Sequence, residues 1–241
     1  MDEMTATGRS TIKGVLFDLD GTLLDTLEDI AVCMNRILKR HGFPRHDTGA
    51  YRFFVGDGVD MLVRRAVAPS DDEKKISRCA SEFRKQYHHG WNRTTRPYDG
   101  ITAMLEKLQS MRLFLAVLSN KPHRTTIDMV RHYFPGQHFT VCMGQGAFPR
   151  KPDPQAALYI ASVMGIKPQE CLYAGDSGTD METAAAAGMP SLGVLWGFRE
   201  KSELGEKGAQ WVADTPDEVV NIIFSINNTT LPKDVRIDGG S

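Results

Sequence analysis

The chain has 241 residues, of which 41% are hydrophobic and 24% are charged, and its formal net charge is −1. This length and composition allow a sizeable core and exclude an intrinsically disordered chain. Basic residues occur only in short clusters such as Arg64 and Arg65, which excludes the broad basic surface of a duplex nucleic-acid binder.

The first part of the chain predicts one strand followed by helices. Residues 1–10 are polar and predict a flexible leader, and residues 14–18 form an apolar run ending in Asp18. Such a run is typical of a strand buried on both faces. Apolar residues then recur at helical spacing in residues 26–40, in residues 59–67 and from residue 70 to about 91. Asp25 followed by Glu28 resembles a capping box at the start of the first helix, and Ser70-Asp71-Asp72-Glu73 resembles another at the start of the third.

After residue 97 the pattern changes to alternating helices and strands. Strands are predicted at residues 113–118, 139–143, 171–174, 191–195 and 210–213, each preceded or followed by a helical segment. This alternation predicts an α/β fold, a Rossmann-like parallel sheet with helices on both faces. We expect a core domain of residues 11–23 and 95–226, an inserted all-helical cap domain of residues 24–94, and a flexible tail of residues 227–241.

Polar residues follow several of the predicted strands. Asp18 and Asp20 follow the first strand, Ser119 and Asn120 follow the second, and residues 175–180 follow a later one. Lys151 lies between a strand and a helix. Because parallel strands bring their carboxyl ends to one edge, we expect these side chains to converge there.

A cluster of carboxylates with oxygen ligands and no nearby His or Cys favours a Mg²⁺ site. One carboxylate of such a cluster could attack a phosphorus atom, while Lys151 and the Ser119 hydroxyl hold phosphoryl oxygens.

The chain has no signature of secretion or of a membrane span. The N-terminus has no apolar signal region, no apolar run is long enough to cross a bilayer, and the four cysteines include no CxxC pair. We therefore expect a cytoplasmic protein with no membrane partner, no nucleic-acid partner, and no disulfide framework.

The segment Asp18-Leu19-Asp20-Gly21-Thr22-Leu23 resembles the first signature of the haloacid dehalogenase superfamily. Three further signatures follow in the family's order: Ser119-Asn120, Lys151-Pro152, and Gly175-Asp176 through Asp180. The resemblance runs from about residue 12 to residue 224. It implies the family's fold, with a cap domain that closes over the substrate, and Mg²⁺ as cofactor.

The resemblance also implies roles for the matching residues. Asp18 would be the nucleophile, and Asp20 would protonate the leaving group and then activate water. Asp18, the backbone carbonyl of Asp20 and Asp176 would bind the metal, and Asp180 would orient Lys151 or the metal's waters. The phosphate would be bound by residues of three signatures: Gly21, Ser119, Asn120 and Lys151.

Within the superfamily the chain looks most like phosphoglycolate phosphatases, through the segments 55–59, 96–100 and 118–122. The predicted function is Mg²⁺-dependent hydrolysis of a small phosphorylated metabolite, with 2-phosphoglycolate favoured. Three alternatives remain open: a sugar phosphomutase, a pyrophosphatase, and a catalytically idle Mg²⁺-binding regulator. The protein is expected to be a monomer or a homodimer. Asp57 is predicted to be structural, and Arg64 and Arg65 to form a solvated helix face.

Overall fold

The computed structural model describes residues 11–228. The expected leader, residues 1–10, and residues 229–241 of the expected tail lie outside the described residues. Residues 227–228, also assigned to the tail, instead form the end of helix α10 (Pro216–Asn228). The Asn227 amide joins this helix to the start of the core, because its Oδ1 accepts from Ile12 N at 2.7 Å and its Nδ2 donates to Ile12 O at 3.0 Å.

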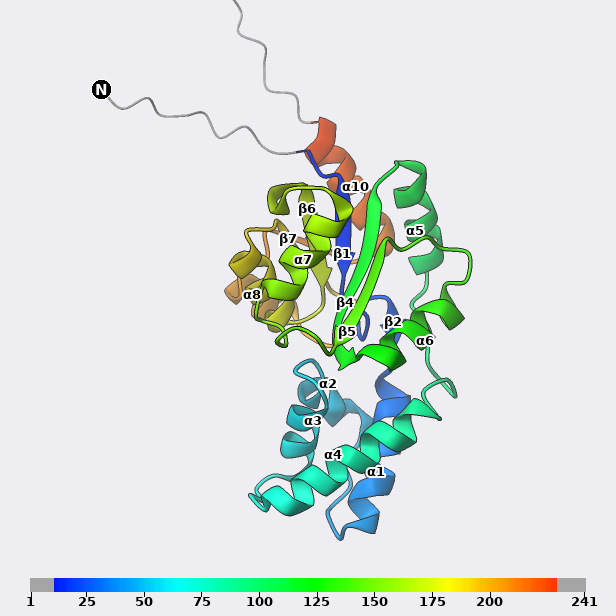
Figure 1. The fold of residues 1–241 in the computed structure, drawn as a ribbon, viewed down its shortest axis with the longest axis vertical. Helices are drawn as coiled ribbons and strands as arrows, with labels where there is room; N and C mark the ends of the chain where they lie inside the picture. Colours follow the sequence, from blue (N-terminus) through cyan, green and yellow to red (C-terminus); the bar gives the residue numbers. More distant parts are fainter. Residues whose placement is uncertain (1–10, 229–241) are drawn as a thin grey trace, which may run out of the picture.

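A six-stranded parallel sheet forms the centre of the core (Figure 1). Its strand order is β5-β4-β1-β6-β7-β8. The strands are β1 (Gly14–Phe17), β4 (Phe114–Pro122), β5 (Val141–Gln145), β6 (Cys171–Gly175), β7 (Ser191–Val194) and β8 (Trp211–Ala213). The predicted α/β fold with a parallel sheet is therefore confirmed.

Helices cover both faces of the sheet, because alternate side chains of each buried strand point to opposite sides. Val15 and Phe17 of β1 belong to a core shared with α5 (Ile101–Ser110), α6 (His123–Tyr133) and α10. Leu16 belongs to a second core shared with α7 (Gln155–Met164) and α8 (Gly178–Ala187). A short helix, α9 (Lys201–Glu206), packs against α8.

The helical insert lies at the carboxyl ends of the strands (Figure 1). It contains α1 (Leu27–Arg40), α2 (Tyr51–Phe54), α3 (Val59–Val67) and α4 (Glu73–His88), with a 3₁₀ turn at Thr48–Ala50. The two connections between insert and core pair with each other as a small antiparallel ribbon, β2 (Leu24–Asp25) with β3 (Arg96–Pro97). The sequence predicted no strand between residues 24 and 94, so β2 is an addition.

The observed helix caps differ from those predicted. The capping box predicted for residues 70–73 is wrong: α4 begins at Glu73, and its N-cap is Asp72, whose side chain accepts from the amides of Lys74 and Lys75, each at 3.1 Å. The predicted Asp25 cap of the first helix is wrong: the N-cap residue is Thr26, and Asp25 lies in β2, 3.7 Å from Arg96. Its ribbon pairing holds Asp25 in an extended conformation, out of reach of the first turn.

Strand β4 extends to Pro122, four residues further than predicted. Among the described residues, no helix has the length and apolar character needed to cross a membrane.

Candidate active site

The strand ends bring the predicted residues to one edge of the sheet. Asp18 follows β1, Ser119 and Asn120 lie in β4 next to it, and Asp176 follows β6 on its other side. Lys151 lies in the loop after β5, and Asp180 lies in the first turn of α8. All six side chains are buried, and the neighbouring strands β4, β1 and β6 explain why they meet.

Lys151 is the cation at the centre of this cluster. Its Nζ lies 2.8 Å from Asp18 Oδ1 and 2.6 Å from Asp180 Oδ1, and it also donates to Leu118 O at 3.3 Å. Burial acts to lower the pKa of Lys151, but the two carboxylates outweigh it and raise this pKa well above its usual range. The ammonium therefore stays charged beside Asp18, where it can hold an incoming anion.

Asp180 is fixed by bonds on both of its oxygens. Oδ1 accepts from Lys151, and Oδ2 accepts from the backbone amide and the hydroxyl of Ser177, at 3.1 and 2.6 Å. Ser177 in turn caps α8. These contacts place Asp180 as a support for Lys151, which is one of the two roles expected of it.

Three acidic groups could hold a divalent cation here. Oxygen atoms of Asp18, Asp176 and Asp180 lie within 4.8 Å of one another. Burial raises the pKa of Asp18 well above its usual range, although the charge of Lys151 opposes this shift. Burial, together with the charge of Asp180, raises the pKa of Asp176 to about 7.

A dense group of buried carboxylates with one ammonium among them is short of positive charge, so a hard divalent cation fits this donor set. Asp18 and Asp176 are the better ligands, because Asp180 already accepts from Lys151 on Oδ1 and twice from Ser177 on Oδ2. Each oxygen of Asp176 accepts only one hydrogen bond.

Asp176 is held where the chain comes unusually close to it. Its oxygens accept from the Thr22 hydroxyl at 3.1 Å and from the Phe198 amide at 2.8 Å. Gly21 has a φ of +86°, and a Cβ there would lie 2.2 Å from Asp176 Oδ2. At Gly197 a Cβ would lie 2.3 Å from the Cβ of Asp176. Glycine is required at both positions, so Gly21 serves the site by permitting this approach.

Ser119 and Asn120 differ in whether their side chains keep a hydrogen-bond donor available for a ligand. The Ser119 oxygen accepts from the Lys121 amide at 3.2 Å, so its own proton remains available to a phosphoryl oxygen. The Asn120 side chain donates to Gly56 O and Lys151 O, at 3.0 and 3.2 Å, and accepts from Lys151 N at 2.9 Å. Asn120, expected among the phosphate-binding residues, thus uses its side chain to position the Lys151 loop and the cap.

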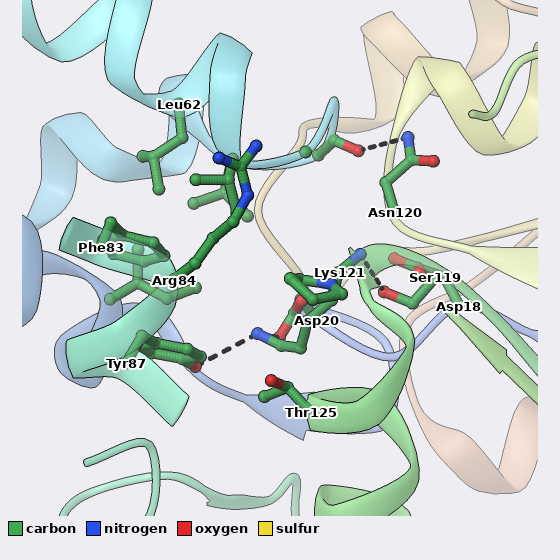
Figure 2. A pocket seen from close by; sticks show the side chains of 16 residues that line it. Asp18, Asp20, Leu62, Phe83, Arg84, Tyr87, Ser119, Asn120, Lys121 and Thr125 are labelled. Atoms are coloured by element: carbon green, nitrogen blue, oxygen red, sulfur yellow. Dashed lines mark hydrogen bonds and ion pairs between the residues drawn. The ribbon is translucent and has the colours of Figure 1, made fainter. Parts of the chain in front are cut away.

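A pocket of about 50 Å³ lies between this edge and the helical insert. Asp18, Asp20 and Ser119 line its core side, and Leu62, Phe83, Arg84 and Tyr87 of the insert line the other (Figure 2). Asp20, which is only partly buried, faces this pocket. The nucleophile and acid–base candidates therefore both border one pocket, whose other side is lined by the folded insert.

Lys121 is a site residue that the sequence analysis did not assign. Its side chain is buried, and its Nζ lies 2.8 Å from Asp20 Oδ1 and 3.2 Å from Tyr87 Oη (Figure 2). Lys121 lies at the end of β4 and lines the same pocket as Ser119. Ending the strand at residue 118 concealed this signal.

The loop before α3 joins the insert to the core through Asp57. Asp57 Oδ1 accepts from Thr179 of α8 at 2.7 Å, and Oδ2 pairs with Arg65 at 2.5 Å. Arg65 therefore has a partner within the insert, whereas Arg64 pairs with Glu73 on the exposed surface, as expected for a solvated helix face. The structural role predicted for Asp57 is extended here to a bond between insert and core.

The family follows from comparison with known proteins. A sequence profile described as haloacid dehalogenase-like hydrolase matches residues 15–194. The chain therefore belongs to the haloacid dehalogenase-like hydrolase family. Its curated relatives include phosphoglycolate phosphatases of Pseudomonas putida, 32% identical over 83% of this chain and 75% of theirs, and of Chromobacterium violaceum, 33% identical over 80% and 90%. The chain is accordingly an enzyme, a phosphatase of this family.

The fold is shared with solved structures as well. A crystal structure of a predicted phosphoglycolate phosphatase from Haemophilus somnus superposes with a TM-score of 0.81 at 26% identity, covering 89% of this chain and 99% of that one. A β-phosphoglucomutase-type structure from Bacteroides vulgatus also matches, with a TM-score of 0.73, but at 22% identity it is evidence for the fold alone.

Proposed function

We propose that this protein is a Mg²⁺-dependent phosphomonoesterase that acts through a phosphorylated Asp18, with 2-phosphoglycolate as its favoured substrate. The observation that carries the proposal is the position of Asp18. It is buried beside the Lys151 ammonium, 2.8 Å away, next to Asp176, and it borders the pocket that Asp20 also faces. The nucleophile and the acid–base group thus border one space, and an anion-binding cation contacts the nucleophile.

The first step transfers the phosphoryl group to the protein. An Asp18 carboxylate oxygen attacks phosphorus and forms the acyl phosphate, while the bond from phosphorus to the ester oxygen breaks. Asp20 donates its proton to that oxygen, and the alcohol leaves. Lys151 and the Ser119 hydroxyl bind phosphoryl oxygens as their charge redistributes.

The second step returns the enzyme to its starting state. Asp20, now ionised, accepts a proton from a water molecule, which attacks the phosphorus of the phospho-aspartate. The bond to Asp18 breaks, and inorganic phosphate leaves. Closure of the insert over the pocket favours small substrates and limits access of other nucleophiles.

Asp18, Asp176 and the backbone carbonyl of Asp20 would hold the Mg²⁺ ion. When bound, the ion supplies positive charge that lets two carboxylates and a phosphate dianion lie close together. Thr22 and the Phe198 amide keep Asp176 in place for this purpose.

The substrate assignment is supported by the relatives and by the pocket. The curated relatives at about 30% identity are named phosphoglycolate phosphatases. The pocket is small, which favours a compact ester over a sugar phosphate.

Phosphate release from a substrate panel tests the proposal. The panel contains 2-phosphoglycolate, sugar phosphates, pyrophosphate and an aryl phosphate, each with and without Mg²⁺. We expect Mg²⁺-dependent turnover that falls at least about a thousandfold in Asp18→Asn and not in Asp71→Asn, an exposed position on the insert. Absence of turnover with all of these esters would contradict the proposal. Product analysis without a bisphosphate activator distinguishes a mutase from a hydrolase.

A further inference from the structure

The buried cation Lys121 has no role in the phosphoryl-transfer steps described above. Its side chain is only 5% exposed, and a buried ammonium is costly unless strong partners surround it. Its partners are the Asp20 carboxylate and the Tyr87 hydroxyl, and it also lies 4.5 Å from the centre of the Tyr87 ring. The fold therefore maintains a second positive charge in the pocket, separate from Lys151.

This ammonium has a donor left for a ligand. An ammonium group carries three N–H donors. Among residues 11–228, Lys121 Nζ donates to Tyr87 Oη and forms an ion pair with Asp20 Oδ1, so at least one N–H remains for a ligand. Thr125 lines the pocket beside it and offers a hydroxyl.

The pocket contains one other candidate cation, Arg84, which is less suited to bind substrate. Its guanidinium pairs with Asp60 at 2.7 Å, and its side chain is 40% exposed. Salt bridges in such exposed positions contribute little because water screens them. Of these two cations that line the pocket, Lys121 is therefore the one that is shielded from water.

The order of the charged groups matches the order of groups in a short substrate. Lys151 lies against Asp18, where phosphorus is expected. The ester oxygen is expected next to Asp20, because Asp20 donates its proton to that oxygen. Lys121 contacts Asp20 and lies towards Tyr87 of the insert (Figure 2). An anionic group one or two carbon atoms beyond the ester oxygen would reach this ammonium.

We propose that Lys121 is a specificity-determining residue that binds the carboxylate of a phosphorylated short hydroxy acid, with Tyr87 holding its ammonium in place. This inference rests on the proposed phosphatase function and adds the residue that recognises the carboxylate of the substrate. A charge-assisted hydrogen bond between ammonium and carboxylate supplies the discrimination.

The test compares two substrates of the same shape, 2-phosphoglycolate and its amide, 2-phosphoglycolamide. The readout is the ratio of kcat/KM for the acid to kcat/KM for the amide, which does not depend on the fraction of folded enzyme. We expect Lys121→Met to lower this ratio about 10- to 100-fold, the effect of one hydrogen bond to a charged group. Lys121→Arg should retain part of the ratio, and Lys207→Met, an exposed lysine paired with Glu182, should leave it unchanged.

Equal losses on both substrates in Lys121→Met would overturn the inference, because Lys121 would then act only through Asp20. A wild-type ratio near one would also overturn it while leaving the phosphatase function intact. A wild-type enzyme that hydrolyses neither compound, nor any ester of the panel, would refute the proposed function and this inference with it.

Discussion

Close approach of the backbone to Asp176 is the feature most sensitive to a single substitution. Three segments distant in sequence meet there: the turn after β1, the start of the loop before α8, and the loop after β7. No side chain fits between them at Gly21 or Gly197, and the carboxylate receives two hydrogen bonds. The position of this acid is therefore set by the absence of side chains as much as by contacts.

Substitution of Gly21 by alanine tests this crowding, with Gly42 as a matched control. Both glycines have positive φ, +86° and +75°, but a Cβ at Gly42 would meet nothing within 4 Å. Gly42→Ala should cost about 1 kcal/mol for the left-handed backbone alone. Gly21→Ala should cost a further 1–3 kcal/mol, roughly the penalty of overpacking, and should abolish phosphate release. Urea unfolding measures both, and equal destabilisation of the two variants would contradict the argument.

At the scale of elements, the loop of residues 55–58 fastens the insert to the core. Asp57 bonds Thr179 of α8, Asn120 of β4 donates to Gly56 O, and Arg199 donates to Val55 O at 3.0 Å. Burial acts to raise the pKa of Asp57, but hydrogen bonds from Thr179 and Arg65 outweigh it and lower this pKa. The loop thus bonds the insert to the core beside the pocket, in part through a carboxylate that stays ionised.

Removal of the Asp57 carboxylate should loosen the attachment of the insert to the core. Asp57→Ala loses bonds to a charged group, each contributing about 1.5–3 kcal/mol, so kcat/KM should fall at least about tenfold. Hydrogen exchange of the amides of residues 55–58 should become faster, and Asp71→Ala on the same insert should change neither property. Unaltered hydrogen exchange in Asp57→Ala would contradict the inference that this loop attaches the insert to the core.

The carboxylate of Asp29 in helix α1 binds residues 93–95, where the chain returns from the insert to the core. Asp29 accepts from the backbone amides of Arg93, Thr94 and Thr95 and from both threonine hydroxyls, at 2.8–3.2 Å. Burial opposes its ionisation, but the bonds from Thr94 and Thr95 outweigh burial and lower the pKa of Asp29. These contacts fix the insert where the chain leaves it, next to the β2–β3 ribbon.

Because folding lowers this pKa, the contribution of Asp29 to stability is complete above its usual value, about 3.9, and is lost as the pH falls through the folded-state value. Asp29→Asn should therefore reduce the free energy of unfolding at pH 7 by about 1–3 kcal/mol. The difference from wild type should shrink below about pH 4. Urea titrations at pH 7 and at about pH 3 measure it, and a difference independent of pH would contradict the assignment.

At the scale of the whole molecule, the site lies between the sheet and the helical insert, which share one hydrophobic cluster. The sheet supplies the charged edge, and the helical insert supplies the apolar wall and Tyr87. The acidic edge carries a cost in like-charge repulsion that a bound cation would relieve. Binding of this cation should thus be visible in global stability.

Mg²⁺ should raise the thermal midpoint of the protein. At a free concentration about a hundredfold above Kd, linkage adds about 2.7 kcal/mol, which corresponds to roughly 5–10 °C for a chain of this size. Asp176→Asn should abolish the shift on Mg²⁺ addition, and Asp71→Asn should retain it. Differential scanning calorimetry with Mg²⁺ or with a chelator makes the measurement, and an undiminished shift in Asp176→Asn would place the ion elsewhere.

The sequence by itself determined the class of fold, because period-2 and helical spacing are local properties. The alternation of helical and strand segments after residue 97 predicted the parallel sheet. Since parallel strands end at one edge, it also predicted that Asp18, Ser119, Lys151 and Asp176 would meet, as the structure places them. The start of α4 was readable to within three residues, because the polar residues that cap a helix lie next to it in the sequence.

Only the tertiary structure decided which side chains are free to act. It directed the Asn120 amide to the Lys151 loop, placed Lys121 between Asp20 and Tyr87, and moved Asp25 from a helix cap into a ribbon. Each of these outcomes depends on a partner more than 30 residues away in the sequence, as Lys151 is from Asn120 and Tyr87 from Lys121. Local spacing carries no information about such partners, because packing of the insert against the sheet edge creates them.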